Sequence, residues 1–285
     1  MAPVPEDSAA LREPGPDDDG ASRDVPGGVV GGSLRLPLTP VGADRVRWAS
    51  VASTIVAAVA LLLAQGTGYA ATLAVTLVLA LAVAWGWPVL TGSFTPMATT
   101  VVLAVAAVAM VLSALREDLL WVPAAAAFGV VLAFFGQLVR RTGREGLVLT
   151  LLSAFAGLVV IASGTTAVVA ANSDRGQAVA VVAMAAVGAA VVTDLLAGVR
   201  AAAPLLGIVA LVAAVLAAVV ATTRVAEVGA LEAVGIGAAV GTVSWSFRRV
   251  LALQPAMLTL RGQIGAGAGS VLAVGAVVHV FSILT

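Results

Sequence analysis

The feature that most constrains this chain is a succession of apolar stretches, each about twenty residues long, that runs from residue 48 to residue 285. Short polar segments separate the stretches and carry nearly all the charge of this part of the chain. About 20 apolar residues in an α-helix span the hydrocarbon core of a bilayer, and a helix satisfies its own backbone hydrogen bonds there. The sequence therefore predicts an all-α integral membrane protein with many spans.

The composition excludes several classes of protein. Hydrophobic residues make up 61% of the chain and charged residues 11%, which leaves too little polar surface for a soluble domain of this length. The absence of Cys and the single His exclude disulfides, thiolate nucleophiles and Cys- or multi-His metal sites. Nucleic-acid binding is excluded because basic residues are few and no soluble domain presents them. No enzymatic motif is present, so we expect a protein that is not an enzyme and holds no metal and no cofactor.

The first 46 residues differ from the rest. They hold seven of the twelve prolines and eight of the fifteen acidic residues, without an apolar period. Such a segment cannot bury enough apolar surface to fold, so residues 1–46 are predicted to be a disordered Pro/Asp/Gly-rich tail. The run Asp17, Asp18 and Asp19 has three possible interpretations. We favour a solvated linker; the alternatives are a partner-binding tail and a metal-binding cluster. A signal peptide begins with basic residues and an apolar core, so we expect none here and a first span that is retained.

Residues 47–285 are predicted to form one polytopic transmembrane domain with nine helices. The expected spans are at about 48–64, 68–87, 97–115, 119–139, 146–169, 178–197, 204–222, 228–247 and 264–284. Arginine decides their orientation, because positive charge is held on the cytoplasmic side. With the N-terminus inside, ten of the arginines from Arg35 onward are cytoplasmic and three are outside. We therefore expect a cytoplasmic N-terminus, in the plasma membrane of a bacterium.

The sequence also indicates an internal repeat. A shift of 108 residues superimposes Pro96 on Pro204, Arg116 on Arg224 and Gly129 on Gly237, and the pair Arg140 and Arg141 on Arg248 and Arg249. The chain is then a first helix at 47–67 and two four-helix repeats, at 68–171 and 176–285. An even number of spans gives both copies the same orientation, as in transporters built from parallel repeats.

Ionisable residues inside the spans are the candidates for chemistry, because a charge in a bilayer is costly. They are Asp194, Glu232 and His279. Asp194 could neutralise Arg200 or Arg248, which we favour, or could coordinate a cation or a proton on a path. Glu232 and His279 could pair and form a protonatable couple. We favour the alternative, in which His279 has no partner and the Glu232 side chain extends toward the membrane surface. Neither a carboxylate at mid-membrane nor a broken helix is evident, so a transported molecule is expected to be apolar or lipid-like.

Small residues indicate close helix packing. Gly265, Gly267 and Gly269 suit a tight interface, although they could instead break the last helix and expose its carbonyls. Gly86-Trp87-Pro88 is predicted to end the second helix, because Pro prevents continuation and Trp anchors at the headgroups.

Basic residues at the cytoplasmic face are candidates for contacts with anionic lipid headgroups. They are Arg140, Arg141, Arg144, Arg248, Arg249 and Arg261. The segment from Arg248 to Gln263 mixes arginine with apolar residues, as in a segment that lies along the inner leaflet. The expected partners are membrane lipids, with a protein bound through the acidic tail as a further possibility.

A resemblance rests on Gly86-Trp87-Pro88, on the segment from Phe135 to Arg141 and on Ala162-Ser163-Gly164. In these the chain resembles a group of uncharacterised multi-span membrane proteins from actinobacteria, which are often labelled permeases. The likeness covers the second to fifth helices best. It implies a plasma-membrane protein and carries over no catalytic or binding residue. Basic residues that are all Arg, with no Lys, fit such a GC-rich source.

Two functional hypotheses follow. The first is a permease- or flippase-like transporter of a hydrophobic or lipid-linked small molecule, favoured by the duplication and the length. The alternative is a non-enzymatic membrane scaffold, favoured by the poverty of buried polar groups.

Overall fold

The structure, a computed structural model, describes residues 46–116, 119–139, 146–199 and 203–284, which contain helices and no strand. All of these residues belong to the unit Leu34–Thr285. Within them, nine helices are long and apolar enough to cross a membrane, so the expected all-α fold is confirmed. Of the tail at residues 1–46, only Val46 is described. The arginines Arg140, Arg141, Arg144 and Arg200 also lie outside the described residues.

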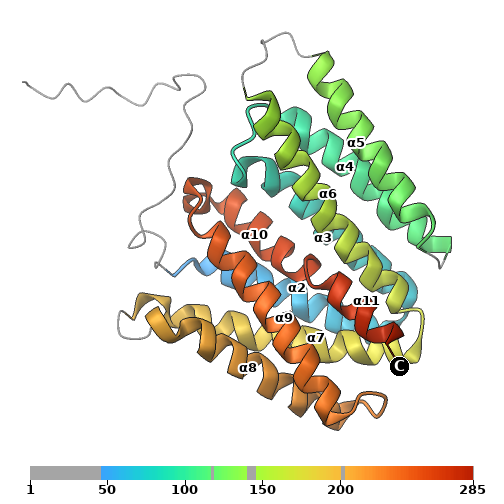
Figure 1. The fold of residues 1–285 in the computed structure, drawn as a ribbon, viewed down its shortest axis with the longest axis vertical. Helices are drawn as coiled ribbons and strands as arrows, with labels where there is room; N and C mark the ends of the chain where they lie inside the picture. Colours follow the sequence, from blue (N-terminus) through green and yellow to red (C-terminus); the bar gives the residue numbers. More distant parts are fainter. Residues whose placement is uncertain (1–45, 117–118, 140–145, 200–202, 285) are drawn as a thin grey trace, which may run out of the picture. The chain divides into compact units, whose positions relative to one another are not determined.

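The helices of the described part (Figure 1) are α2 Trp48–Thr67, α3 Tyr69–Leu90, α4 Pro96–Ser113, α5 Trp121–Leu138, α6 Leu147–Ala170, α7 Asp174–Val192, α8 Leu206–Ala221, α9 Ala230–Leu251, α10 Leu260–Leu272 and α11 Gly275–Ile283. Short 3-10 helices extend or connect them: η1 Ala114–Arg116, η2 Thr193–Gly198, η3 Ala203–Leu205, η4 Thr222–Arg224 and η5 Pro255–Leu258. The last span is formed by α10 and α11 together.

Contacts between segments far apart in sequence define the two ends of the helix bundle. Arg47 Nη2 donates a hydrogen bond to the carbonyl of Ala252, 3.2 Å away, so the start of α2 lies beside the end of α9. At the opposite end, the Tyr69 hydroxyl donates to the carbonyl of Ala114, which places the start of α3 beside η1. We call these the Arg47 end, which is the predicted cytoplasmic end, and the Tyr69 end.

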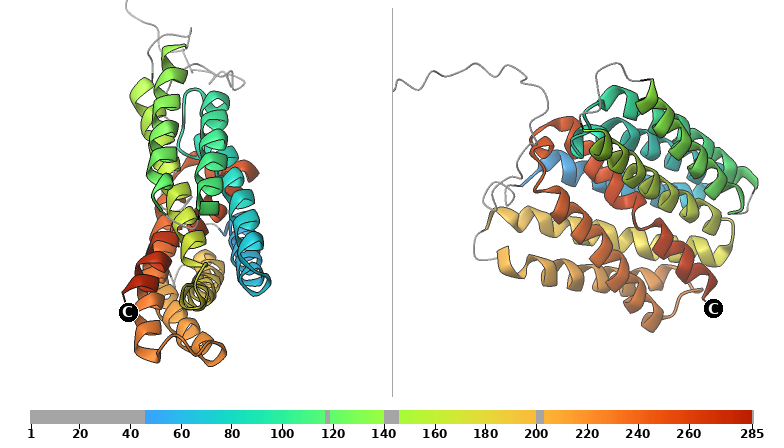
Figure 2. Two further views of the ribbon diagram at one scale, coloured as in Figure 1. Left: turned by 90° about the vertical axis from the view of Figure 1, so that its right-hand side faces the viewer. Right: turned by 45° about the horizontal axis from the view of Figure 1, so that its top comes forward.

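Two large apolar clusters form most of the interior, and a third, smaller one joins α5 and α6. The first is centred on α7 and includes residues of α2, α8, α9 and α11; the second joins α3, α4, α6 and α10. The span made of α10 and α11 lies between the two groups, with α10 against α2 and α3 and α11 against α6 and α7 (Figure 1, Figure 2). It is the most buried of the nine spans in the described part. Features of this span are therefore interior features.

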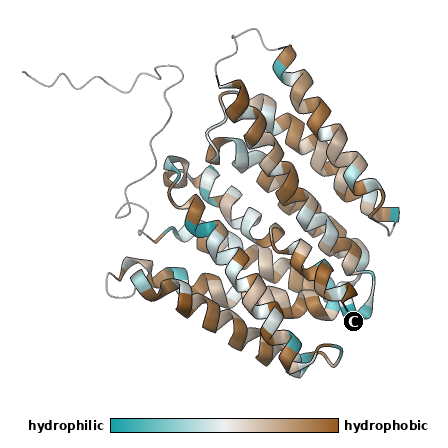
Figure 3. Ribbon diagram, in the orientation of Figure 1, coloured by the Kyte–Doolittle hydropathy of each residue, from teal (hydrophilic) through white to brown (hydrophobic). Residues whose placement is uncertain are grey.

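The outward faces suit a lipid environment. Large apolar side chains such as Val56, Leu63, Phe128 and Phe135 are exposed. Hydrophilic residues are found mainly near helix ends, and most helices are predominantly hydrophobic along their length (Figure 3). With nine such helices, the chain is a multi-pass membrane protein.

The prediction that Gly86-Trp87-Pro88 ends a helix at the headgroups is wrong. Helix α3 continues to Leu90, and Trp87 is only 4% exposed. The Trp87 Nε1–H donates to the carbonyl of Ser153, 2.9 Å away, and its ring stacks on Phe247. A buried Trp with a satisfied N–H contributes to the core rather than to an interfacial belt.

Gly86 has a packing role. A Cβ built on Gly86 would lie 2.5 Å from Gly265 Cα, so the backbones of α3 and α10 are in direct contact. Gly267 likewise faces Ser53, and Gly269 faces Phe247. Helix α10 runs unbroken through these glycines, so they serve close packing and do not break the helix.

The internal repeat stays a prediction, although equivalent positions have similar surroundings. Helices α4 and α8 each pass into a 3-10 turn that ends at Arg116 or Arg224. Gly129 lies against Ala106 of α4, and Gly237 lies against Val215 of α8. Each glycine thus sits where its helix meets the preceding one.

Candidate functional site

The last span is interrupted near its middle. Helix α10 ends at Leu272 and α11 begins at Gly275, and Ala273 and Val274 between them form a short turn with right-handed backbone angles (Figure 1). Val274 is fully buried, which places the interruption inside the protein. The expectation that no broken helix is present is therefore corrected only by this short turn, because Leu260–Ile283 still forms one span. Backbone groups that an interrupted helix leaves unpaired at membrane depth are tolerated only where protein or water satisfies them.

Ser163 of α6 satisfies two of these groups. Its hydroxyl donates to the carbonyl of Ala273 at 3.0 Å and accepts from the backbone N–H of Ala276 at 2.9 Å. Gly275 permits this approach, because a Cβ there would collide with the carbonyl of Ser163. Sequence reasoning did not identify Ser163 as a partner of the last span. The small trio Ala162-Ser163-Gly164 was the available signal for a close helix contact.

A small cavity of about 20 Å³ adjoins the interruption. Gly164 and Gly275 line one side, and Gln65, Thr72 and Thr76 supply polar groups from α2 and α3. Gln65 Oε1 is buried and has no hydrogen-bond partner among the described residues. A cavity of this size with polar partners holds about one water molecule. The cavity beside the break is thus mainly apolar, and the buried oxygen of Gln65 is its unpaired polar atom.

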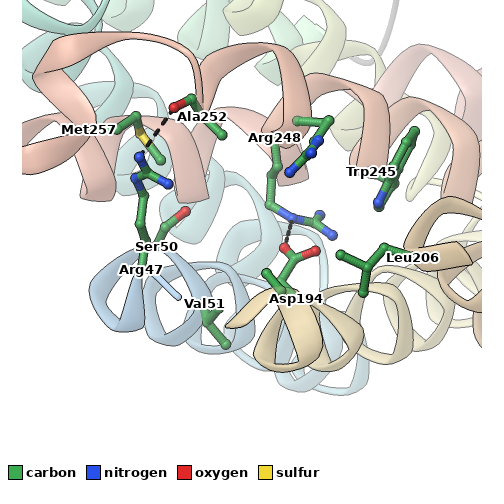
Figure 4. A pocket seen from close by; sticks show the side chains of 11 residues that line it. Arg47, Ser50, Val51, Asp194, Leu206, Trp245, Arg248, Ala252 and Met257 are labelled. Carbon is green, nitrogen blue, oxygen red and sulfur yellow. Dashed lines mark hydrogen bonds and ion pairs between the residues drawn. The ribbon is translucent and has the colours of Figure 1, made fainter. Parts of the chain in front are cut away.

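A second cavity, of about 60 Å³, lies at the Arg47 end and is drawn in Figure 4. Its lining includes three arginines, Arg47, Arg248 and Arg249, and one acid, Asp194. Ser50 and Val51 of α2, Ala197 of η2, Leu206 of α8, Trp245 of α9, and Ala252 and Met257 complete it. Helices α2, α8 and α9 and the turns η2 and η5 therefore meet around a basic pocket, which we call the arginine pocket.

Arg248 is the buried member of the arginine pocket. It is 5% exposed, and its Nε donates to Asp194 Oδ2 at 2.6 Å (Figure 4). Its Nη1 donates to Ser244 Oγ at 2.6 Å, whereas Nη2 is buried without an acceptor among the described residues. Asp194 thus forms the structural ion pair that we favoured from the sequence. Its partner is Arg248, one of the two arginines considered there.

Glu232 and His279 do not form a couple. Glu232 Oε1 accepts from Arg175 Nη2 at 2.6 Å, and Arg175 Nη1 donates to the carbonyl of Glu227 at 3.0 Å. His279 Nδ1 is buried and has no hydrogen-bond partner in the described part of the chain. The alternative in which the two residues pair is therefore wrong, and Glu232 belongs to an ion pair at the Tyr69 end.

The predicted lipid contacts have different surroundings. Arg249 lines the arginine pocket. Arg261 Nε donates to the carbonyl of Trp85 at 2.7 Å, Nη2 donates to Thr100 Oγ1 at 3.1 Å, and the guanidinium lies 5.2 Å from the centroid of the Trp85 ring. Arg261 thus links the start of α10 to α3 and α4 by hydrogen bonds.

A motif that sequence reasoning missed opens two helices. Ser173-Asp174-Arg175-Gly176-Gln177 and Thr259-Leu260-Arg261-Gly262-Gln263 share the pattern Ser/Thr-x-Arg-Gly-Gln. In both, the hydroxyl accepts from the Gly N–H, at 3.0 and 3.1 Å, and the Gln side chain donates to a carbonyl six residues earlier. The two copies begin at opposite ends of the bundle, because α7 starts at the Tyr69 end and α10 at the Arg47 end. The motif caps a helix and presents an arginine to its neighbours.

No three His, Asp or Glu side chains of the described residues are grouped so that they could hold a metal. The fold and these sites define a multi-pass α-helical membrane protein with an interrupted interior helix and a basic pocket at one end. Comparison with protein-family models, with curated proteins and with solved structures found no match.

Proposed function

We propose that the protein is a permease- or flippase-like transporter of a hydrophobic or lipid-linked small molecule, in a bacterial plasma membrane, with its N-terminus inside. The observation that carries this proposal is the interruption between α10 and α11, in the interior and beside a small cavity that is mainly apolar and contains a few polar side chains. Transporters place binding sites at discontinuous helices near mid-membrane. In such a mechanism two halves of the transporter move relative to each other, and we propose that the two predicted parallel repeats are these halves.

The distribution of charge supports an apolar or lipid-linked cargo. The Asp, Glu and Arg residues that the structure describes lie near helix ends or in the turns between helices, and the interior cavity offers hydroxyl groups and one amide. A charged cargo crossing the interior would need an opposite charge there.

A groove between α4 and α5 supports the same cargo class. Its volume is about 340 Å³, and it is lined mainly by apolar residues that include Phe128. Arg116 and Trp121 form its polar end, with the guanidinium 5.5 Å from the centroid of the indole ring. A lipid chain fits the apolar part, and an anionic group fits the arginine.

The alternative is a membrane scaffold whose acidic tail recruits a protein partner. The small volume of the interior cavities, about 20 Å³ beside the break and about 10 Å³ near Gln137, favours this alternative. Both proposals describe a protein that is not an enzyme and needs no cofactor.

Single cysteines distinguish the two proposals, because the chain contains no Cys of its own. Thr76→Cys places a thiol in the cavity at the break, and Val83→Cys places one on the same helix where the side chain is fully buried in packed core. Both variants are treated in native membranes with a charged, membrane-impermeant methanethiosulfonate. A transporter that exposes its site to water during its cycle predicts modification at Thr76→Cys and none at Val83→Cys. If both thiols resist equally, the packed scaffold is correct.

A further inference from the structure

We propose that the groove between α4 and α5 binds one phospholipid, with an acyl chain along the groove and the phosphodiester on Arg116. The lipid belongs to the leaflet at the Tyr69 end, which is the predicted outer leaflet. This site deepens the proposed function, because it names the lipid class and the residue that recognises its polar group. It rests on that function where the bound lipid is taken as cargo.

The shape of the groove suits a hydrocarbon chain. Helices α4 and α5 lie side by side (Figure 1), and their lining residues run from Ala109 to Arg116 and from Trp121 to Phe128. Seven residues in a helix extend about 10 Å, so the groove is elongated along the helices. Its volume of about 340 Å³ lies within the range of about 300–1,000 Å³ that is typical of ligand pockets.

The side chains of the groove are apolar along most of its length. Trp121 and Phe128 are large and half-exposed, whereas four lining residues are small: Ala109, Ser113, Ala124 and Ala125. The Ser113 hydroxyl donates to the carbonyl of Met110 at 2.6 Å, so it is already satisfied within its own helix. The groove between the arginine and Phe128 therefore requires no polar partner, which is the environment that an acyl chain prefers.

Arg116 forms the polar end of the groove. It is the exposed last residue of η1, at the Tyr69 end. Its guanidinium lies 5.5 Å from the centroid of the Trp121 ring, and this cation–π contact holds it beside the groove. Arg116 has no hydrogen bond and no ion pair with any residue that the structure describes. Its N–H groups can therefore donate to a ligand.

The position of Arg116 selects a phospholipid. Residues at the end of a span lie at the level of the headgroups, and a Trp ring is typical there. A guanidinium pairs with two phosphate oxygens at once. A donor for phosphate at this level, with an apolar groove leading from it into the membrane, matches the order of groups in a phospholipid. Glu117 and Asp118 follow in the sequence, outside the described residues, so recognition rests on the donors of Arg116 and not on a net positive charge.

The test compares two lipids that differ in the phosphate. Each lipid is titrated into the full-length protein in dodecyl maltoside, and native mass spectrometry counts the lipids that the protein retains. Dioleoylphosphatidylglycerol has two oleoyl chains and a phosphodiester, whereas dioleoylglycerol has the same chains and no phosphate. We expect one phosphatidylglycerol per chain, bound at least about fivefold more tightly than dioleoylglycerol. Equal affinity for the two lipids would overturn the proposal.

Arg116→Gln tests the recognition of phosphate. It should weaken the binding of phosphatidylglycerol about fivefold and leave that of dioleoylglycerol unchanged, because only the first lipid has an acceptor for the guanidinium. Arg224→Gln is the matched control. Arg224 is the exposed last residue of η4 and does not line the groove, so this variant should bind as the unmodified protein does. If the two variants bind phosphatidylglycerol alike, Arg116 does not hold the phosphate and the proposal is overturned.

Ala124→Phe tests the place of the acyl chain. The added ring fills the groove, so the one-to-one retention of phosphatidylglycerol should be lost. In the matched control, Ala127→Phe, the same ring is added at an exposed position of α5 that does not line the groove, and retention should persist. If Ala124→Phe retains the lipid as the control does, the proposal is overturned. Binding is measured without transport, so its failure would leave the labelling of Thr76→Cys as a separate test of the transport function.

Discussion

Replacement of Gly86 by alanine tests the packing of the interior span. The added Cβ would lie 2.5 Å from Gly265 Cα, 2.7 Å from the Arg261 carbonyl oxygen and 2.8 Å from Gly265 N. All three atoms are backbone, so no side chain can rotate away. Because carbon atoms in contact prefer a separation of about 3.5–4.0 Å, α3 and α10 must separate by roughly 1 Å.

The magnitude follows from two opposing terms. Overpacking of this kind costs about 1–3 kcal/mol, and the upper part of that range applies because backbone has to move. Alanine recovers about 1 kcal/mol of helix propensity relative to glycine. We therefore expect Gly86→Ala to lower the free energy of unfolding by about 2 kcal/mol.

Gly188→Ala is the matched control. Gly188 lies within α7, and a Cβ there would have no neighbouring atom within 4 Å. The same substitution should raise the free energy of unfolding by about 0.5–1 kcal/mol. Unfolding is measured by titration with sodium dodecyl sulfate in mixed micelles, followed by tryptophan fluorescence. If Gly86→Ala is as stable as the unmodified protein, the contact of α3 with α10 is wrong.

Three further predictions concern the break, the outer ion pair and the orientation. Ser163→Ala removes two hydrogen bonds across the break, each worth about 0.6 kcal/mol in a membrane protein, so we expect a loss of about 1 kcal/mol in the same titration; an unchanged midpoint would mean that Ser163 does not support the break. Glu232→Gln should lower the free energy of unfolding by less than about 1 kcal/mol, because the side chains of Glu232 and Arg175 are 22% and 27% exposed to solvent. Salt screens such a pair, so the difference from the unmodified protein should shrink in 1 M salt. A loss of stability that does not depend on salt would contradict an ion-pair contribution. In intact cells an impermeant maleimide should label Arg224→Cys but not Arg249→Cys, and the reverse pattern would refute a cytoplasmic N-terminus.

The spans were predictable because each depends on a local property. An apolar stretch of sufficient length has to be helical in a bilayer, wherever its neighbours lie. The expected span at about 146–169 and the helix Leu147–Ala170 therefore agree closely.

The break between α10 and α11 was not predictable in this way. No proline marks it, and Gly275, which adjoins it, is one of five glycines in the last span, of which four lie in the unbroken α10. It depends on Ser163, which lies on another helix and is 110 residues away from Ala273 in sequence. A feature that a tertiary hydrogen bond supports leaves no periodic signal in its own segment.

The polar sites show the same limit. The sequence placed Asp194 near two arginines, but only the packing of η2 against α9 brings it to Arg248. The sequence suggested His279 as a possible partner of Glu232 only because both residues are expected at a similar depth in the membrane. In the structure, Arg175 at the start of α7 forms the ion pair with Glu232. The repeated Ser/Thr-x-Arg-Gly-Gln motif was visible in the sequence and would have drawn attention to Arg175 and Arg261.

Native mass spectrometry of the protein, extracted gently from its own membrane, tests the central claim of transport most directly. The account predicts one defined amphiphile, distinct from the bulk lipids, that is retained at a ratio of one per chain. Replacement of Gln65 or Thr76 in the cavity at the break should reduce its retention. If the spectrum instead shows a stoichiometric protein partner and only bulk lipid, the protein is a scaffold and the transport proposal is contradicted.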